Sequence, residues 1–135
     1  LSRYHLKVRF IMKKNVFTGT VLHGDKLGRT IGFPTINLDV NLVTKEVLKK
    51  GVYKAEVEVK QKKYVGALYY GPRLVLNEIR DVLEIHLLDF DQEIYGEKVK
   101  FIIQNFIRGI IKFNSFEELK NQLQIDVKMC SNSED

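Results

Sequence analysis

Residues 28–38 of this sequence, GRTIGFPTINL, place two oxygen donors at a spacing suited to a metal ion. Pro34 fixes its own φ and moves the preceding residue out of the helical region, so the segment is predicted to be extended. Residues i and i+2 of an extended chain share a face, which brings the Thr35 hydroxyl and the Asn37 amide oxygen together. Because Mg²⁺ prefers oxygen and is often held partly by substrate phosphates, the spacing predicts a site for Mg·ATP, with magnesium or another divalent ion.

Glu84 is the second group that could do chemistry, because it is a carboxylate inside a largely apolar run, residues 82–90. It is either a solvated position of a half-buried strand or a general base at the mouth of a barrel. His86 would share its face, and its simpler interpretation is a surface or hydrogen-bonded strand histidine. Arg108 is either a surface arginine or a clamp for an anionic substrate.

Several other kinds of site do not fit the sequence. Gly19 and Gly24 have the glycine spacing of a P-loop, but Asp25 stands where that motif needs lysine. No GxGxxG follows a predicted strand, and the three histidines lack the spacing of a zinc site. No GxSxG nucleophile elbow is present, and the acidic run 89–93 lacks the glycine and glutamate positions of an EF-hand.

The elements that must position these residues are short strands and one helix. Alternating apolar and polar residues predict strands at 16–22, 35–38, 53–59, 64–70, 82–90 and 98–106, with a turn at 61–63 and one helical turn within 41–50. Ser115 followed by Glu118 is a capping box, and a helical apolar stripe follows it: Phe116, Leu119, Leu123 and Val127. Such closely spaced strands favour a closed antiparallel barrel or a sandwich with the helix outside it or over one end.

Length and composition indicate one domain. The chain has 135 residues, of which 44% are hydrophobic, and no apolar run long enough to span a membrane. The single cysteine, Cys130, cannot form an internal disulfide, and no signal peptide pattern is present, so we predict a cytoplasmic monomer. We assign residues 1–14 to a basic arm or linker, 15–128 to the domain and 129–135 to a frayed tail.

The net charge of +5 comes entirely from the first 14 residues, which hold five basic side chains and no acidic one. Subtracting these five from 22 leaves 17 basic residues against 17 acidic ones in residues 15–135. A neutral body lacks the electrostatic footprint of nucleic-acid binding, so no nucleic-acid partner is predicted.

At this point the motifs resemble those of the riboflavin kinase family, in particular the kinase module of bacterial bifunctional FAD synthetases. The resemblance runs from about residue 16 to residue 128 and is carried by GTVLHG (19–24), GRTIGFPTINL (28–38), GVY (51–53), EIHLLDFD (84–91), YG (95–96), IR (107–108) and KF (112–113).

The resemblance implies a closed six-stranded antiparallel Greek-key barrel with a C-terminal helix. The implied reaction transfers the γ-phosphoryl group of ATP to the 5′-hydroxyl of riboflavin, giving FMN and ADP. Glu84 would be the catalytic base, Thr35 and Asn37 would hold the metal, and Tyr95 and Arg108 would lie on the flavin side. The implied ATP loop and phosphate site comprises Gly24, Lys26, Gly28, Arg29, Gly32, Pro34, Thr35 and Asn37.

The sequence departs from the family pattern at residues 69–75, YYGPRLV, where bacterial modules usually read NIGxRPT. Gly71 and Arg73 are retained, and the other differences alter one wall of the implied site. These 135 residues hold no HxGH-type nucleotidyl-transferase motif, so the chain as given is not expected to make FAD, although an FAD synthetase domain could precede it. The alternatives are a catalytically silent flavin- or nucleotide-binding barrel and a nucleic-acid-binding barrel that uses the basic arm.

Overall fold

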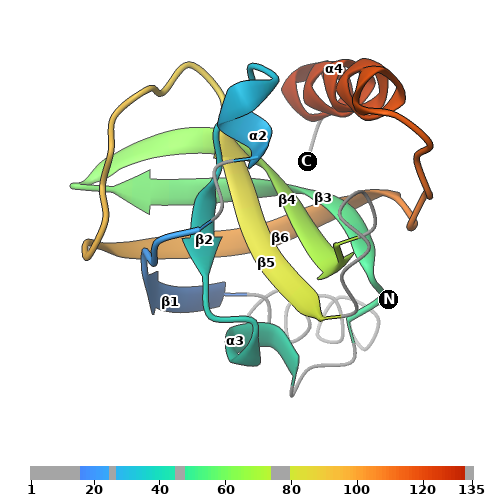
Figure 1. Cartoon of the computed structure of the whole chain (residues 1–135). Coiled ribbons are helices and arrows are strands. Elements are labelled where there is room, and N and C mark those ends of the chain that lie inside the picture. The colour runs from blue at the N-terminus through green and yellow to red at the C-terminus, as the bar shows by residue number, and fades with distance from the viewer. Residues whose placement is uncertain (1–15, 25–26, 45–47, 74–79, 133–135) are drawn as a thin grey trace, which may run out of the picture.

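The computed structural model describes residues 16–24, 27–44, 48–73 and 80–132. Within these residues the chain forms a six-stranded sheet, short helices α2 and α3, and the longer helix α4 (Figure 1). The strands are β1 (Val16–Thr20), β2 (Ile36–Leu38), β3 (Gly51–Val59), β4 (Lys62–Pro72), β5 (Asp81–Leu87) and β6 (Lys98–Arg108), and the helices are α2 (Leu27–Thr30), α3 (Asn41–Thr44) and α4 (Phe116–Asn132). The predicted mainly β fold with a C-terminal helix is confirmed.

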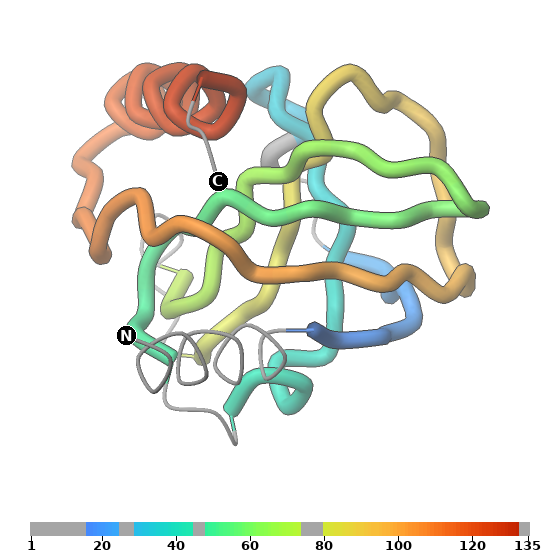
Figure 2. Tube along the Cα trace, turned by 180° about the vertical axis from the view of Figure 1, so that it is seen from behind, coloured from blue at the N-terminus to red at the C-terminus, as the bar shows by residue number. Residues whose placement is uncertain are grey.

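Every strand pairs antiparallel with its neighbours, in the order β1-β6-β3-β4-β5-β2. Register shifts between β3 and β6 near Tyr53 mark an irregularity of the bulge type, which bends a sheet. The sheet curls into a half-barrel, as the trace in Figure 2 shows. Its edges approach each other at one isolated bridge, where the Leu22 N–H donates to the Asn37 carbonyl at 2.7 Å.

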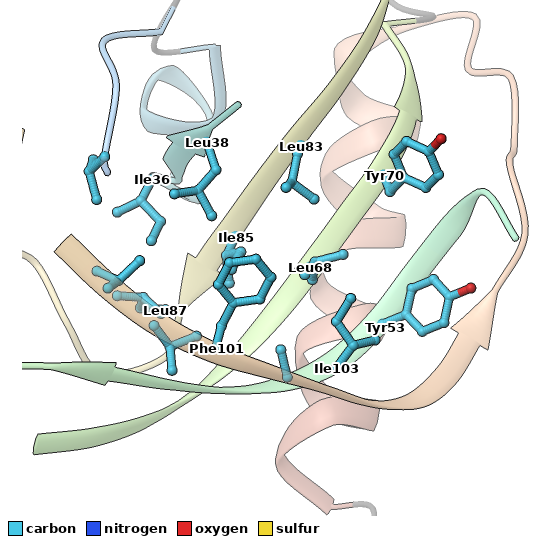
Figure 3. Close-up of a cluster of buried hydrophobic side chains, with 14 of the residues drawn as sticks. Ile36, Leu38, Tyr53, Leu68, Tyr70, Leu83, Ile85, Leu87, Phe101 and Ile103 are labelled. Carbon is cyan, nitrogen blue, oxygen red and sulfur yellow. The ribbon is translucent and has the colours of Figure 1, made fainter. Parts of the chain in front are cut away.

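The concave face of the sheet holds the hydrophobic core. Alternate residues of β5, Leu83, Ile85 and Leu87, point into it together with Leu68 and Phe101 (Figure 3). Because successive strand residues point to opposite faces, Glu84 and His86 must lie on the outer face. The period-two pattern of the sequence therefore predicted correctly which side chains of β5 point into the core, but it did not predict the burial of Lys54 on β3.

Several predicted boundaries are corrected by the structure. Strand β1 ends at Thr20 rather than Leu22, β3 begins at Gly51 rather than Tyr53, and β6 continues to Arg108 rather than Phe106. The β3–β4 turn lies at Lys60 and Gln61, both with positive φ, so β4 begins at Lys62 rather than Tyr64. This is the primed two-residue turn that matches strand twist. Strand β5 ends at Leu87 rather than Phe90, because Asp89 adopts a φ of 56° that breaks the extended chain.

A further correction concerns the C-terminus. Helix α4 continues to Asn132, and Cys130 is fully buried, so residues 129–132 are not a frayed tail. The apolar stripe of the helix was predicted to end at Val127, and the buried Cys130 extends it by about one turn. The predicted basic arm, residues 1–14, lies outside the described residues.

Candidate functional site

Strand register brings the predicted catalytic and metal-binding residues together on the outer face of the sheet. Glu84 on β5 pairs with Asn37 on β2 and with Tyr69 on β4. Thr35, two residues before Asn37, also faces Glu84, since its hydroxyl donates to the Glu84 Oε1 atom at 3.2 Å. Thr35 and Asn37 thus both lie next to Glu84, which agrees with the prediction that they share a face.

The second oxygen of the Glu84 carboxylate is bound by Arg73. The Arg73 Nη2 group donates to Glu84 Oε2, and the side chains are only 8% and 15% exposed. The sequence analysis did not assign Arg73 to the site. The available signal was that Arg73 is one of two residues of segment 69–75 that keep the family pattern.

Asn37 lies directly against the glycine loop. A Cβ atom on Gly24 would lie 2.1 Å from Asn37 Nδ2 and 2.6 Å from Asn37 Oδ1, which is closer than atoms can approach. Residue 24 must therefore be glycine for the Asn37 side chain to keep its place.

The segment before β2 is fixed by His86. Its Nδ1 atom lies 2.7 Å from the Pro34 carbonyl oxygen, and its ring meets the edge of Phe33 at a centroid distance of 5.4 Å. His86 is therefore a hydrogen-bonded strand histidine, which agrees with the interpretation given above. Its contacts hold Pro34, and with it Thr35, against β5.

A largely apolar cavity lies between this face of the sheet and α4. It encloses about 900 Å³ of empty space, including its open mouth. Apolar side chains from three parts of the chain form its walls, among them Ile31, Phe33, Val82, Phe113, Leu119 and Leu123. Its polar groups include Glu84, Arg73 and Tyr69 on the sheet side and Arg108 and Asp126 near α4, so the Glu84 carboxylate is one of the few charged groups in an otherwise apolar chamber.

A second, more polar cavity lies beside the first. It encloses about 550 Å³ including open solvent and is lined by Arg29, Pro34, Thr35, Asp91 and Gln92, among others. Thr35 lines both cavities. The Thr35 and Glu84 pair consequently stands where an apolar chamber and a polar chamber meet.

Tyr69 forms part of the wall between Glu84 and Arg108. Burial raises the pKa of Tyr69 to about 12, so its phenol is neutral at ordinary pH. Its hydroxyl donates to the carbonyl oxygen of Pro72, the last residue of β4. The departure from the family pattern at this position therefore supplies a contact that fixes the end of the strand.

The two residues predicted on the flavin side lie apart. Arg108 lines the apolar cavity, but Asp126 on α4 accepts its Nε and Nη2 groups at 2.9 and 2.8 Å. Tyr95 is not among the residues lining that cavity, and its ring stacks on His23 at 4.0 Å, beside Gly24. In the predicted ATP loop, the exposed side chains of Arg29 and Glu93 approach each other at 3.9 Å. Gly28 lies in α2, and Gly32 forms a turn with a φ of 91°. Lys26 lies outside the described residues.

The two predicted metal ligands, Thr35 and Asn37, offer neutral oxygens, next to the Glu84 carboxylate that accepts the Thr35 hydroxyl at 3.2 Å. Among the described residues, no cluster of three or more histidine, cysteine, aspartate or glutamate side chains is arranged to hold a metal. Hydroxyl and amide oxygens alone suit a cation whose remaining ligands come from phosphates and water. In the same part of the chain, none of the helices has the length and apolarity needed to cross a membrane.

This fold and site define a class of protein, a mainly β domain with a curled antiparallel sheet and two cavities that meet at Thr35. The sequence model described as "Flavokinase: Riboflavin kinase" matches residues 12–133. The chain therefore belongs to the flavokinase (riboflavin kinase) family.

Curated relatives agree with this membership. The chain is 43% identical over 111 residues to a bifunctional riboflavin kinase/FMN adenylyltransferase of Haemophilus influenzae, covering 82% of this chain and 35% of the relative. It is 41% identical over 110 residues to the Escherichia coli K12 protein of the same description, covering 81% and 34%. The chain thus spans about a third of the length of these relatives.

Solved structures resemble the fold as well. A Streptococcus pneumoniae structure described as a macrolide-efflux protein gives a TM-score of 0.76 at 34% identity, covering 88% of this chain and 39% of that one. Riboflavin kinase from Trypanosoma brucei gives a TM-score of 0.60 at 25% identity, covering 87% and 77%.

Proposed function

We propose that this chain is a riboflavin kinase, which transfers the γ-phosphoryl group of ATP to the 5′-hydroxyl of riboflavin and yields FMN and ADP. The observation that carries the proposal is the position of Glu84 and Thr35 at the junction of an apolar and a polar cavity. Two substrates of different polarity, bound one in each cavity, would meet at that carboxylate. The family and the relatives supply the identity of the two substrates.

The apolar cavity fits the flavin ring. Its walls include the aromatic rings of Phe33 and Phe113 and the aliphatic side chains of Leu119 and Leu123. Pockets for small molecules are typically lined by such side chains, with a few polar groups that set the orientation. A ring held there would direct its ribityl chain toward Glu84.

The polar side fits Mg·ATP. We assign to it the loop glycines Gly24, Gly28 and Gly32, together with Lys26, Arg29 and Pro34. Tyr95 joins this side rather than the flavin side, because it stacks on His23 next to Gly24. Thr35 and Asn37 would hold the magnesium, whose charge would offset that of the phosphate oxygens when it is bound.

Glu84 acts as the base in this account. Its carboxylate accepts the proton of the 5′-hydroxyl while that oxygen forms a bond to the γ-phosphorus. The bond from the γ-phosphorus to the bridging oxygen breaks, and ADP leaves with the electron pair. Because phosphoryl transfer depends mainly on positioning and charge stabilisation, a carboxylate fixed by two partners suits the role.

Four further proposals concern the whole protein. The Leu22–Asn37 bridge joins the sheet edges and would complete the closed Greek-key barrel predicted above. The relatives named as bifunctional support an FMN adenylyltransferase domain in the same polypeptide. A monomeric state and a cytoplasmic location stay predictions, which size-exclusion chromatography and cell fractionation would test.

The test of the proposed function is direct. The purified chain is incubated with riboflavin and Mg·ATP, and FMN is separated by chromatography. We expect FMN and ADP in equal amounts, with no FMN when ATP is omitted. Riboflavin binding without any FMN would instead support the silent flavin-binding barrel.

A further inference from the structure

The Glu84 carboxylate is held on both of its oxygens. Oε1 accepts the Thr35 hydroxyl at 3.2 Å, and Oε2 accepts the Arg73 guanidinium. The side chains of Arg73 and Glu84 are 8% and 15% exposed, so water screens this ion pair weakly. Separating a buried carboxylate from its cation costs much free energy, so Arg73 and Glu84 should stay paired in the folded protein.

Arg73 is itself held in place by the end of β4. It directly follows Pro72, whose carbonyl oxygen accepts the Tyr69 hydroxyl. Gly71 leaves the room for this arrangement, since a Cβ there would lie 3.2 Å from the Tyr69 hydroxyl oxygen and 2.7 Å from Ile110 Cδ1. The backbone that carries Arg73 is thus fixed by the same strand that pairs with Glu84.

We propose that Arg73 is a positioning residue for phosphoryl transfer, whose guanidinium keeps the Glu84 carboxylate aimed at the junction of the two cavities. The inference rests on the proposed function and adds a residue to it. Thr35 alone would not fix the carboxylate, because a single hydrogen bond leaves the side chain free to rotate about it. Two contacts on different oxygens define the plane of the carboxylate, and a displacement of about 1 Å can cost roughly 10²-fold in rate.

Arg73 also lines the apolar cavity, so a direct contact with substrate is the competing role. The two roles differ in their coupling to Glu84. A residue that acts only through Glu84 loses its effect once the carboxylate is gone, whereas a residue that touches substrate keeps its effect. Double-mutant cycles measure this difference.

The experiment compares wild type with Arg73→Ala, Arg73→Lys, Glu84→Gln and the double variant Arg73→Ala/Glu84→Gln, and uses Lys100→Ala as the control for loss of one exposed cation. FMN formation is followed at saturating substrate, and riboflavin and Mg·ADP affinities are measured separately. We expect Arg73→Ala to lower kcat by roughly 10²-fold with both affinities retained. Arg73→Lys should be intermediate, because an ammonium lacks the planar fork of guanidinium.

Two further readouts separate positioning from a general loss of structure. Added guanidinium ions should restore part of the kcat of Arg73→Ala. They would not restore activity if the variant were inactive because it is misfolded. The double variant should be as slow as Glu84→Gln alone. A further drop in the double variant, or an Arg73→Ala kcat near that of wild type, would overturn the inference. Absence of FMN with wild type would instead refute the proposed function itself.

Discussion

At the scale of single residues, the account depends on three strands placing Asn37, Glu84 and Tyr69 in one row. The shared face of Thr35 and Asn37 follows from local extended geometry, so the sequence could predict it. The row could not be predicted, because the register of β5 against β2 and β4 is set by contacts between distant parts of the chain. The same reason explains why Arg73 was missed, since its partner lies 11 residues away on the next strand.

In the proposed ATP site, Gly24 lies so close to Asn37 that no side chain fits at position 24. Changing Gly24 to Ala places a Cβ 2.1 Å from Asn37 Nδ2, so the amide must move away from its position beside Thr35. We expect Mg·ADP affinity to fall about tenfold or more, which corresponds to about 1.4 kcal/mol, while riboflavin affinity is retained. Isothermal titration calorimetry measures both.

Gly109→Ala is the matched control, because a Cβ there meets nothing within 4 Å. Its Mg·ADP affinity should equal that of wild type. Equal affinities for Gly24→Ala and Gly109→Ala would show that the Asn37 amide does not contribute to nucleotide binding.

At the scale of elements, helix α4 forms one wall of the proposed flavin cavity and is attached by a buried ion pair. Asp126 is 1% exposed and accepts two hydrogen bonds from Arg108 and a third from Gln122 at 3.0 Å. Arg108 had two interpretations in the sequence, and its bond to α4 favours a structural role. The sequence predicted the helix but could not reveal that a charged residue of its inner face is buried.

Removing this attachment should expose the helix interior. Asp126→Ala leaves Arg108 without its carboxylate partner, which typically costs about 3–5 kcal/mol. Cys130, one turn further along α4 and fully buried, provides the readout. We expect a thiol reagent to modify Cys130 faster in Asp126→Ala than in wild type, and riboflavin affinity to fall. Glu117→Gln, an exposed change on the same helix, should leave the labelling rate unchanged. A wild-type rate in Asp126→Ala would refute the anchoring role.

At the scale of the whole molecule, folding is linked to protons at alkaline pH. Burial raises the pKa of Tyr69 from 10.0 to about 12 and that of the Cys130 thiol from 9.0 to about 11. Between the unfolded and the folded pKa of each group, the folded chain keeps a proton that the unfolded chain has lost. The contribution of the two groups to folding stability is therefore complete below about pH 9 and falls as the pH rises toward about 12. Urea unfolding should show lower stability at about pH 10.5 than at about pH 8.

The variant Tyr69→Phe/Cys130→Ala tests the cause of this pH dependence. Without the two groups, the loss of stability between the same pH values should be smaller than in wild type. If both proteins lost the same amount of folding stability over this pH range, groups other than Tyr69 and Cys130 would be responsible.

The helices and strands that build the fold were largely predictable because the signals for each element are local. Alternation in β3 and β5, and the Ser115 cap of α4, determine element type from neighbouring residues; the Glu118 N–H donates to Ser115 Oγ at 3.1 Å, as predicted. The turn at Lys60 and Gln61 was misplaced because neither residue is a usual turn former, and the strand register imposes their positive φ. The end of α4 was misplaced because the polar final residues hide a buried Cys130.

The central claim is that Glu84 is the base of a riboflavin kinase. The most direct test is FMN formation by Glu84→Gln beside wild type, with riboflavin and Mg·ATP both saturating. Glutamine keeps the shape of the side chain and its capacity to accept the Thr35 hydroxyl but cannot accept the substrate proton. We predict that kcat falls by about 10²–10⁴-fold while both substrates still bind. A Glu84→Gln variant that forms FMN at the wild-type rate would contradict the account.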